Sequence, residues 1–274
     1  MTPNATAHAT TQTESLLLCE SKDGVATVTL NRPGQFNALS SALIDELQST
    51  FDRLAADSTI RVVVLAANGR GFCAGHDLKE IRAMGSVPDV EALFARCSRM
   101  MMTITTLPQP VIARVHGIAT AAGCQLVSMC DLAVAADTAR FALPGVSIGV
   151  FCSTPAVGVA RSVGRKRAME MLLTGAPIDA ATALDWGLVN RVVPAERLDA
   201  EVDELAAAIL ARSAPVIANG KRTFYAQIDQ SLDTAYRVAA DAMVRDLSAP
   251  DAAEGIDAFL EKRTARWPST PPGD

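Results

Sequence analysis

A strand, a loop of small residues and a helix follow one another three times in the first half of this sequence. The strands are residues 25–31, which alternate apolar and polar side chains, and two apolar runs at 61–67 and 110–117. A short apolar run bounded by turn residues is typical of a strand buried on both faces, the environment that a parallel sheet provides. The repeated order therefore predicts an α/β fold with parallel pairing, although the three units share no sequence.

Apolar residues at helical spacing fill the intervals between these strands. Residues 41–57 carry such residues three and four positions apart, and Ser40 or Ser41 is a suitable N-cap. Pro108 ends the helix predicted at 90–107. The same reasoning predicts a loop at 68–77, helices at 78–84 and 90–107, and strands at 132–137 and 139–143.

The chain divides into three parts by composition. Residues 1–14 are Thr/Ala-rich and polar, without the charged and apolar regions of a signal peptide, and predict a disordered tail. Residues 15–200 hold the strand and helix units, and the pattern becomes nearly all helical from Thr154 onward. Residues 201–274 predict a helical C-terminal subdomain, whose amphipathic helices pack either on a partner subunit or only on the chain's own core.

Composition excludes several classes of protein. The 274 residues carry a formal net charge of −5 and no long basic run, so we expect no nucleic-acid partner. No stretch reaches the roughly 18 apolar residues of a membrane span. The six cysteines form no CxxC pair and the three histidines no ligand-spaced cluster, which favours free thiols in a reducing compartment and no metal. We therefore expect a cytoplasmic protein.

Three short basic clusters remain, at 161–167, 221–222 and 262–263. A small phosphate-bearing ligand is one use for such clusters. We interpret most of them instead as solvated helix faces, because basic side chains on amphipathic helices commonly meet water.

The loop at 68–77 has the composition of a ligand-binding turn. Gly69, Gly71 and Gly75 permit unusual dihedral angles and a close approach of the backbone to a ligand. The loop leads into a helix, whose first N–H groups lack partners and carry the positive end of the helix dipole. Such a site can hold an anion or a developing oxyanion. A tight glycine turn without a ligand is the alternative interpretation.

A second helix entry follows the strand at 110–117. Ala121, Ala122 and Gly123 leave the first N–H groups of that helix accessible. Two such entries, one in each repeated unit, can converge at the same ends of neighbouring parallel strands. A pair of backbone N–H donors is what an acyl carbonyl needs when it becomes an enolate or a tetrahedral oxyanion.

Four segments of the chain match the signature patterns of one enzyme superfamily. "GFCAGHDLKEI" is similar to A-G-x-D-[IL]-K, and "HGIATAAGCQLVSMCDLAVAAD" to N-G-x-x-x-G-G-G-x-E-L followed by C-D-x-x-x-A. The segments that begin "FALPGVSIGVFCSTP" and "FLEKRTARW" resemble a third block and the C-terminal end. Across residues 16–267 the chain thus resembles the crotonase (enoyl-CoA hydratase/isomerase) superfamily. It is most similar to the enoyl-CoA hydratase domain-containing proteins, which share "LPGV" and "FCSTP".

The resemblance implies a crotonase (ClpP-like) spiral of ββα repeats, with C-terminal helices that assemble a homotrimer or a dimer of trimers. It implies an acyl-CoA thioester as the substrate and no separate cofactor, since coenzyme A is part of that substrate. Two backbone N–H groups polarise the thioester carbonyl in this family, and the matching positions are His76 and Ala122. The residues implied to border coenzyme A, the last two from a neighbouring subunit, are Ala74, Asp77, Leu78, Lys79, Phe259 and Lys262.

Two nearby side chains carry more than one interpretation, and a third, Asp131, carries one. The His76 imidazole is either a catalytic group or a helix-entry side chain that reaches solvent. Asp77 precedes a helix, and we interpret it as a cap that holds the loop rather than as a ligand contact. Asp131 follows a helix and is interpreted as a structural residue at the turn into the next strand.

The sequence departs from the family at both acid/base positions of the hydratase reaction. Relatives carry two glutamates there, and the matching residues are Gln125 and Gly145. An amide cannot take a proton near neutral pH, and glycine has no side chain. The loss of a positioned acid/base group typically costs a factor of about 10²–10⁴ in rate, so we do not expect efficient hydration by the usual route.

Cys152 and Ser153 lie in the third block, on a loop that reaches the active site in relatives. Ser153 falls near a position where certain isomerases carry an aspartate. Either side chain is a candidate nucleophile if His76 lies within reach as a base. The alternative is that both are packing and N-cap residues of the next helix.

Several functions therefore stay open. The first is a lyase or isomerase of fatty acid metabolism in the enoyl-CoA hydratase/isomerase grouping, which performs isomerisation, thioester hydrolysis or weak hydration. The second is a non-catalytic acyl-CoA-binding pseudoenzyme. The third is a serine or cysteine hydrolase, although the sequence has no GxSxG elbow.

Overall fold

The computed structural model describes residues 15–269, and the predicted tail at 1–14 lies outside them. The larger of two sheets has six strands in the order β1-β2-β3-β5-β7-β10. All neighbours in it are parallel except β1 and β2. The strands are β1 Leu17–Lys22, β2 Val25–Leu30, β3 Val62–Ala67, β5 Val111–Val115, β7 Leu132–Ala136 and β10 Arg191–Val193.

The sequence patterns do not reveal the two edge strands, β1 and β10. Only one residue of β1 is buried and none of β10 is, so neither strand carries an apolar pattern. By contrast all six residues of β3 are buried, which explains its continuous apolar run. The chain is nearly all helical from Thr154 onward, as predicted, and the strands in that part are β10 and the two-residue strand β9, Ile178–Asp179.

A second sheet, in the order β4-β6-β8-β9, lies beside the first. Its other strands are β4 Gly71–Cys73, β6 Ile118–Thr120 and β8 Arg140–Ala142. The predicted loop at 68–77 is therefore wrong in part, because β4 lies within it and pairs with β6. The units that contain β3 and β4, β5 and β6, and β7 and β8 each have one strand in either sheet and a following helix, whereas both strands of the first unit, β1 and β2, lie in the larger sheet. This arrangement confirms the predicted α/β fold class with parallel pairing, and it has the repeated strand, strand, helix order that the crotonase resemblance implies.

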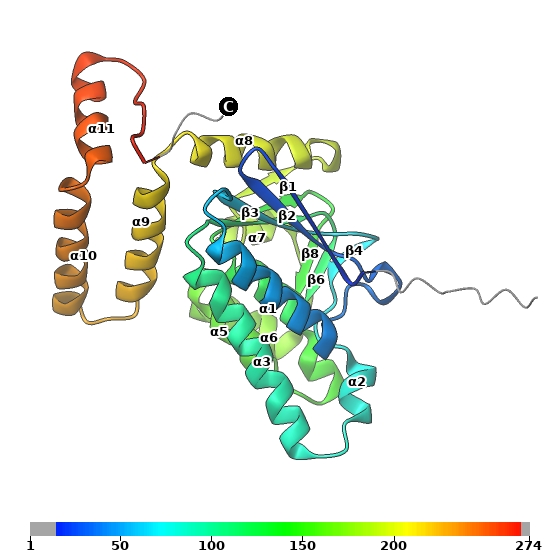
Figure 1. The fold of residues 1–274 in the computed structure, drawn as a ribbon. Helices are drawn as coiled ribbons and strands as arrows, with labels where there is room; N and C mark the ends of the chain where they lie inside the picture. The colour runs from blue at the N-terminus through cyan, green and yellow to red at the C-terminus, as the bar shows by residue number, and fades with distance from the viewer. Residues whose placement is uncertain (1–14, 270–274) are drawn as a thin grey trace, which may run out of the picture.

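Helices cover both faces of the larger sheet (Figure 1). The main core joins the sheet to α1, α3 and α4, and α8 packs on the other face. Ser40 caps α1 by accepting from the Leu43 N–H at 3.3 Å, as the sequence predicts. The helices are α1 Ser41–Ala56, α2 Leu78–Ala83, α3 Val87–Thr106, α4 Ala122–Met129, α5 Ser153–Ser162, α6 Arg165–Thr174, α7 Ala180–Trp186, α8 Leu198–Leu210, α9 Ala214–Gln227, α10 Leu232–Leu247 and α11 Pro250–Glu261.

The last three helices, α9 to α11, stand to one side of the body (Figure 1). A buried ion pair fixes α9 to it, because the Lys221 ammonium lies 2.6 Å from the Asp131 carboxylate. Asp131 also accepts from the Val111 N–H at 2.7 Å and from the Tyr225 hydroxyl at 3.0 Å. The structural role predicted for Asp131 is confirmed. Lys221 is an exception to the solvated helix faces predicted for most of the basic clusters, since 6% of its side chain is exposed.

Within residues 15–269, no helix is long and apolar enough to span a bilayer, and His, Cys, Asp and Glu side chains form no group of three that could hold a metal ion. All six cysteines are free thiols. Five of them are buried, and Cys19 is exposed.

Candidate active site

The loop after β4 holds one backbone donor in place. Leu39 pairs with this loop from the other side, donating to the Gly75 carbonyl at 2.8 Å and accepting from the Asp77 N–H at 3.1 Å. His76 lies between them, and its N–H takes no part in this bridge. Among residues 15–269, no acceptor receives the His76 N–H. Gly75 turns the chain at φ +91°, a conformation that side chains rarely adopt.

The start of α4 holds the second donor. Ala121 precedes the helix at φ 49°, an unusual angle for a residue with a side chain, and its N–H donates to the Ala142 carbonyl at 2.9 Å. Ala122 is then the first residue of α4, and its N–H has no acceptor in the described part of the chain. Gly123 packs so tightly on the Cys73 carbonyl that any side chain at 123 would clash.

The two loops touch each other at the donors. A Cβ built on Gly75 would lie 3.2 Å from the Ala122 nitrogen and 2.9 Å from the Ala121 Cβ. The Thr120 hydroxyl donates to the Ala74 carbonyl at 3.0 Å and ties the loops together. The structure thus brings His76 and Ala122 to adjoining turns, each with an uncommitted N–H group. We call these two groups the donor pair.

The His76 residue is partly buried. Its Nε2 atom is buried and has no hydrogen-bond partner in residues 15–269. The ring packs on Phe94 of α3, with ring centroids 4.9 Å apart and planes tilted by 57°. Burial lowers the pKa of His76, although the Glu80 carboxylate acts in the opposite direction.

Gln125 lies in the first turns of α4, 5% exposed. Its Oε1 atom is buried without a hydrogen-bond partner among the described residues. Buried polar atoms are nearly always paired in folded proteins, and exceptions often mark sites that a ligand or water completes. Gln125 therefore offers an unsatisfied acceptor close in sequence to the Ala122 donor.

Asp77 caps α2, as the sequence predicts. Its carboxylate accepts from the N–H groups of Lys79 at 3.2 Å and Glu80 at 3.3 Å, and pairs with Arg32 at 3.1 Å. Burial alone would raise the pKa of Asp77, but the Arg32 guanidinium and the two N–H groups outweigh it and lower that pKa. Ala74, Leu78 and Lys79 are exposed beside this cap.

In the third block, Val150 and Cys152 pack against Gly145. The Cys152 thiol accepts from the Gly145 N–H at 3.3 Å, and burial raises the pKa of this thiol. Cys152 occupies the N-cap position of α5, but its side chain caps no N–H. Ser153 is the first residue of α5, and its hydroxyl donates to the Phe151 carbonyl at 3.4 Å. No hydrogen bond joins Cys152 or Ser153 to the His76 ring.

Gly145 has no room for a side chain, which leads to a prediction. A Cβ there would lie 2.6 Å from the Val150 carbonyl oxygen and 2.9 Å from the Cys152 sulfur. We expect Gly145→Ala to lower the free energy of unfolding by about 1–3 kcal/mol in urea denaturation. Gly34→Ala is the control, since no atom lies within 4 Å of its new Cβ. Equal losses in the two variants would contradict the prediction.

Phe259 and Lys262 lie far from the donor pair within one chain. Both belong to the end of α11, on the opposite side of the molecule from α2 (Figure 1). Phe259 is 82% exposed, so its side chain is free to contact another molecule. A single chain does not bring these two residues to the other candidate site residues.

Asn37 is a site-supporting residue that the sequence interpretation misses. It is fully buried, and its amide donates to the carbonyls of Asn68 and Gly71, each at 2.9 Å. Its φ of 54° is a left-handed conformation that asparagine tolerates. Together these bonds hold the turn that enters β4. The Pro-Gly turn just before it, at 33–34, is the only local signal that points to this segment.

Comparison with known proteins identifies the family. The family model described as "Enoyl-CoA hydratase/isomerase" matches residues 20–270. The chain is 47% identical to the human "Enoyl-CoA hydratase domain-containing protein 3, mitochondrial", over 91% of this chain and 82% of that protein. It is 33% identical to "Probable enoyl-CoA hydratase echA8" of Mycobacterium tuberculosis, over 93% of this chain and 98% of that protein.

Solved structures of related proteins have the same fold as this chain. A Mycobacterium smegmatis enoyl-CoA hydratase superposes with a TM-score of 0.91 at 53% identity, covering 93% of this chain and 99% of the other. The human enoyl-CoA hydratase domain-containing protein 3 superposes with a TM-score of 0.89 at 46% identity, covering 92% and 100%. With the matched family model, these relatives show that the chain belongs to the enoyl-CoA hydratase/isomerase family.

Proposed function

We propose that the chain binds an acyl-CoA thioester and uses the donor pair to stabilise the negative charge that develops on its carbonyl oxygen. The observation that carries this proposal is the contact of two turns that each present an uncommitted N–H group. Donors held rigidly before the reaction cost no reorganisation when the charge develops, which is why such pairs are effective. The family supports the substrate class, since its members are named for enoyl-CoA.

Hydration by a pair of glutamates is not the reaction we propose. Gln125 carries an amide and Gly145 has no space for a carboxylate. Nucleophilic hydrolysis through Cys152 is also disfavoured, because the thiol is buried, its pKa is raised and no base is bonded to it. Reactions that begin with an enolate, such as isomerisation, fit the donor pair best. Thioester hydrolysis by water and binding without catalysis are the remaining candidates.

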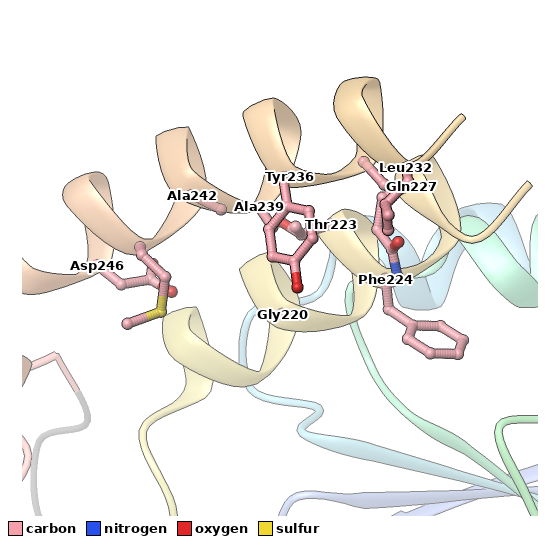
Figure 2. A pocket seen from close by; sticks show the side chains of 11 residues that line it. Gly220, Thr223, Phe224, Gln227, Leu232, Tyr236, Ala239, Ala242 and Asp246 are labelled. Atoms are coloured by element: carbon pink, nitrogen blue, oxygen red, sulfur yellow. The ribbon is translucent and has the colours of Figure 1, made fainter. Parts of the chain in front are cut away.

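We propose that Ala74, Leu78 and Lys79 border coenzyme A from the same chain, and that Phe259 and Lys262 reach it from a neighbouring subunit. The exposed position of Phe259 supports this assignment, since α11 is distant from α2 in one chain. An apolar groove of about 490 Å³ lies between α9 and α10, lined by Phe224 and Tyr236 (Figure 2). Such a surface fits a homotrimer or a dimer of trimers. Light scattering after size-exclusion chromatography tests the assembly.

Calorimetric titration with butyryl-CoA and steady-state turnover of crotonyl-CoA test the proposed function together. We expect butyryl-CoA to bind and hydration of crotonyl-CoA to proceed no faster than in a variant with a blocked site. The absence of acyl-CoA binding would overturn the proposal. Efficient hydration would instead overturn the argument from Gln125 and Gly145, while leaving the binding site intact.

The cytoplasmic location predicted from the sequence stays a prediction. The human relative with 47% identity carries a mitochondrial name, so a mitochondrial location is the alternative. Fractionation of the source cells, with an antibody against this chain, decides between the two locations.

A further inference from the structure

One of the two residues that supply the donor pair has a titratable side chain. The residue that supplies the first N–H is His76, and the Nε2 atom of its ring is buried without a partner among residues 15–269. Unpaired buried polar atoms are rare, and each one raises the question of what completes it. The backbone of His76 is held by the Leu39 bridge and its ring by Phe94, so both ends of the residue are fixed.

The other candidate acids and bases at the site are already committed or absent. Gln125 cannot accept a proton, and Gly145 has no side chain. The Asp77 carboxylate is bonded to Arg32 and to two N–H groups of α2. Glu80, the charged group that acts on His76, accepts from the Ser41 N–H at 2.9 Å.

The protonation state of His76 suits a base. Burial disfavours the imidazolium and lowers the pKa of His76, with Glu80 opposing that shift in part. The ring is therefore neutral at pH 7, with a lone pair on one nitrogen. A neutral imidazole is the side chain most often used for proton transfer in enzymes.

We propose that the His76 imidazole is the catalytic base that removes the α-proton of the bound acyl-CoA thioester. The α-carbon–hydrogen bond breaks and a bond from that proton to the unprotonated nitrogen of the imidazole forms. The electron pair of the broken bond moves into the thioester, whose oxygen becomes an enolate held by the N–H groups of His76 and Ala122. The reverse step returns the proton to carbon, so no other reactant is needed. This inference rests on the proposed acyl-CoA site.

Exchange of the α-protons of butyryl-CoA for deuterium, followed by NMR in D₂O, measures this step directly. His76→Phe keeps a ring to pack on Phe94 and keeps the backbone N–H, but it removes the nitrogen. We expect exchange to fall about 10²–10⁴-fold in this variant. The dissociation constant for butyryl-CoA, from calorimetry, should change by less than about threefold, because the donor pair is retained. His76→Gln, which keeps a polar group, should lose exchange equally.

His116→Gln is the matched control. His116 also has a buried ring nitrogen without a partner in the described residues, but its Nε2 is 2.9 Å from the Gly69 carbonyl oxygen, away from the donor pair. We expect exchange at the wild-type rate in this control. Wild-type exchange in His76→Phe or His76→Gln would overturn the proposal. Wild-type protein that binds butyryl-CoA without exchange would also overturn it, whereas protein that binds no acyl-CoA would overturn the proposed function itself.

Discussion

Lys221→Met is expected to lower the free energy of unfolding by about 3–5 kcal/mol, because it leaves a buried carboxylate without its cation. The Lys221 and Asp131 side chains are 6% and 15% exposed, and their charged atoms lie 2.6 Å apart. Lys221 also donates to the carbonyls of Ile104 at 2.8 Å and Gln109 at 2.9 Å. The variant therefore removes one ion pair and two hydrogen bonds at once. Urea denaturation measures the loss.

Arg222→Met is the matched control, since Arg222 is the exposed neighbour of Lys221 on α9. We expect it to change stability by less than about 0.5 kcal/mol, as exposed surface changes usually do. Replacing both members of the pair, with Lys221→Met and Asp131→Leu, should recover part of the loss, because no unpaired charge then stays buried. Equal stability of Lys221→Met and Arg222→Met would contradict the prediction.

Lys221 also shows why sequence alone misjudges some positions. Its local sequence, a Lys-Arg pair on an amphipathic helix, predicts a solvated face. The partner Asp131 lies 90 positions earlier, so no periodicity within α9 reveals it. Burial lowers the pKa of Lys221, and Asp131 opposes this by favouring the charged form. A contact of this kind becomes visible only when the fold brings the two segments together.

Other parts of the fold could be predicted, because their signals are local. The continuous apolar run of β3 and the Ser40 cap of α1 are confirmed within a residue or two. The strands β4 and β6 have three residues each and begin at Gly71 and Ile118, which pair with each other. Such short strands bury too few residues to give a pattern, and their pairing depends on segments far apart in the sequence.

Some features of the candidate site can likewise be predicted from the sequence and others cannot. The backbone conformation at the two helix entries requires glycine or alanine, so these residues form a pattern that is visible in the sequence. The packing of the His76 ring on Phe94 and the crowding of Gly145 by Val150 leave no such pattern. Both depend on tertiary contacts with other segments. This is why the positions of the donors follow from the sequence, whereas the state of the acid/base groups does not.

Gly75→Ala is expected to reduce α-proton exchange of bound acyl-CoA by about 10²–10³-fold, the cost of losing one oxyanion donor. The new methyl group would lie 3.2 Å from the Ala122 nitrogen and 2.9 Å from the Ala121 Cβ, so the two turns must move apart. The φ of +91° adds strain of about 1–3 kcal/mol, which urea denaturation should detect.

Gly187→Ala separates these two effects. Gly187 has a similar φ of +86°, but the nearest atom to its new Cβ is the Ser162 carbonyl oxygen at 3.5 Å. It ends α7, away from the donor pair. The control should therefore lose stability through backbone strain while it keeps the exchange rate of the wild type. If both variants lost exchange in proportion to stability, general destabilisation would explain the effect. A loss confined to Gly75→Ala requires that the contact between the two turns itself sets the geometry of the donor pair.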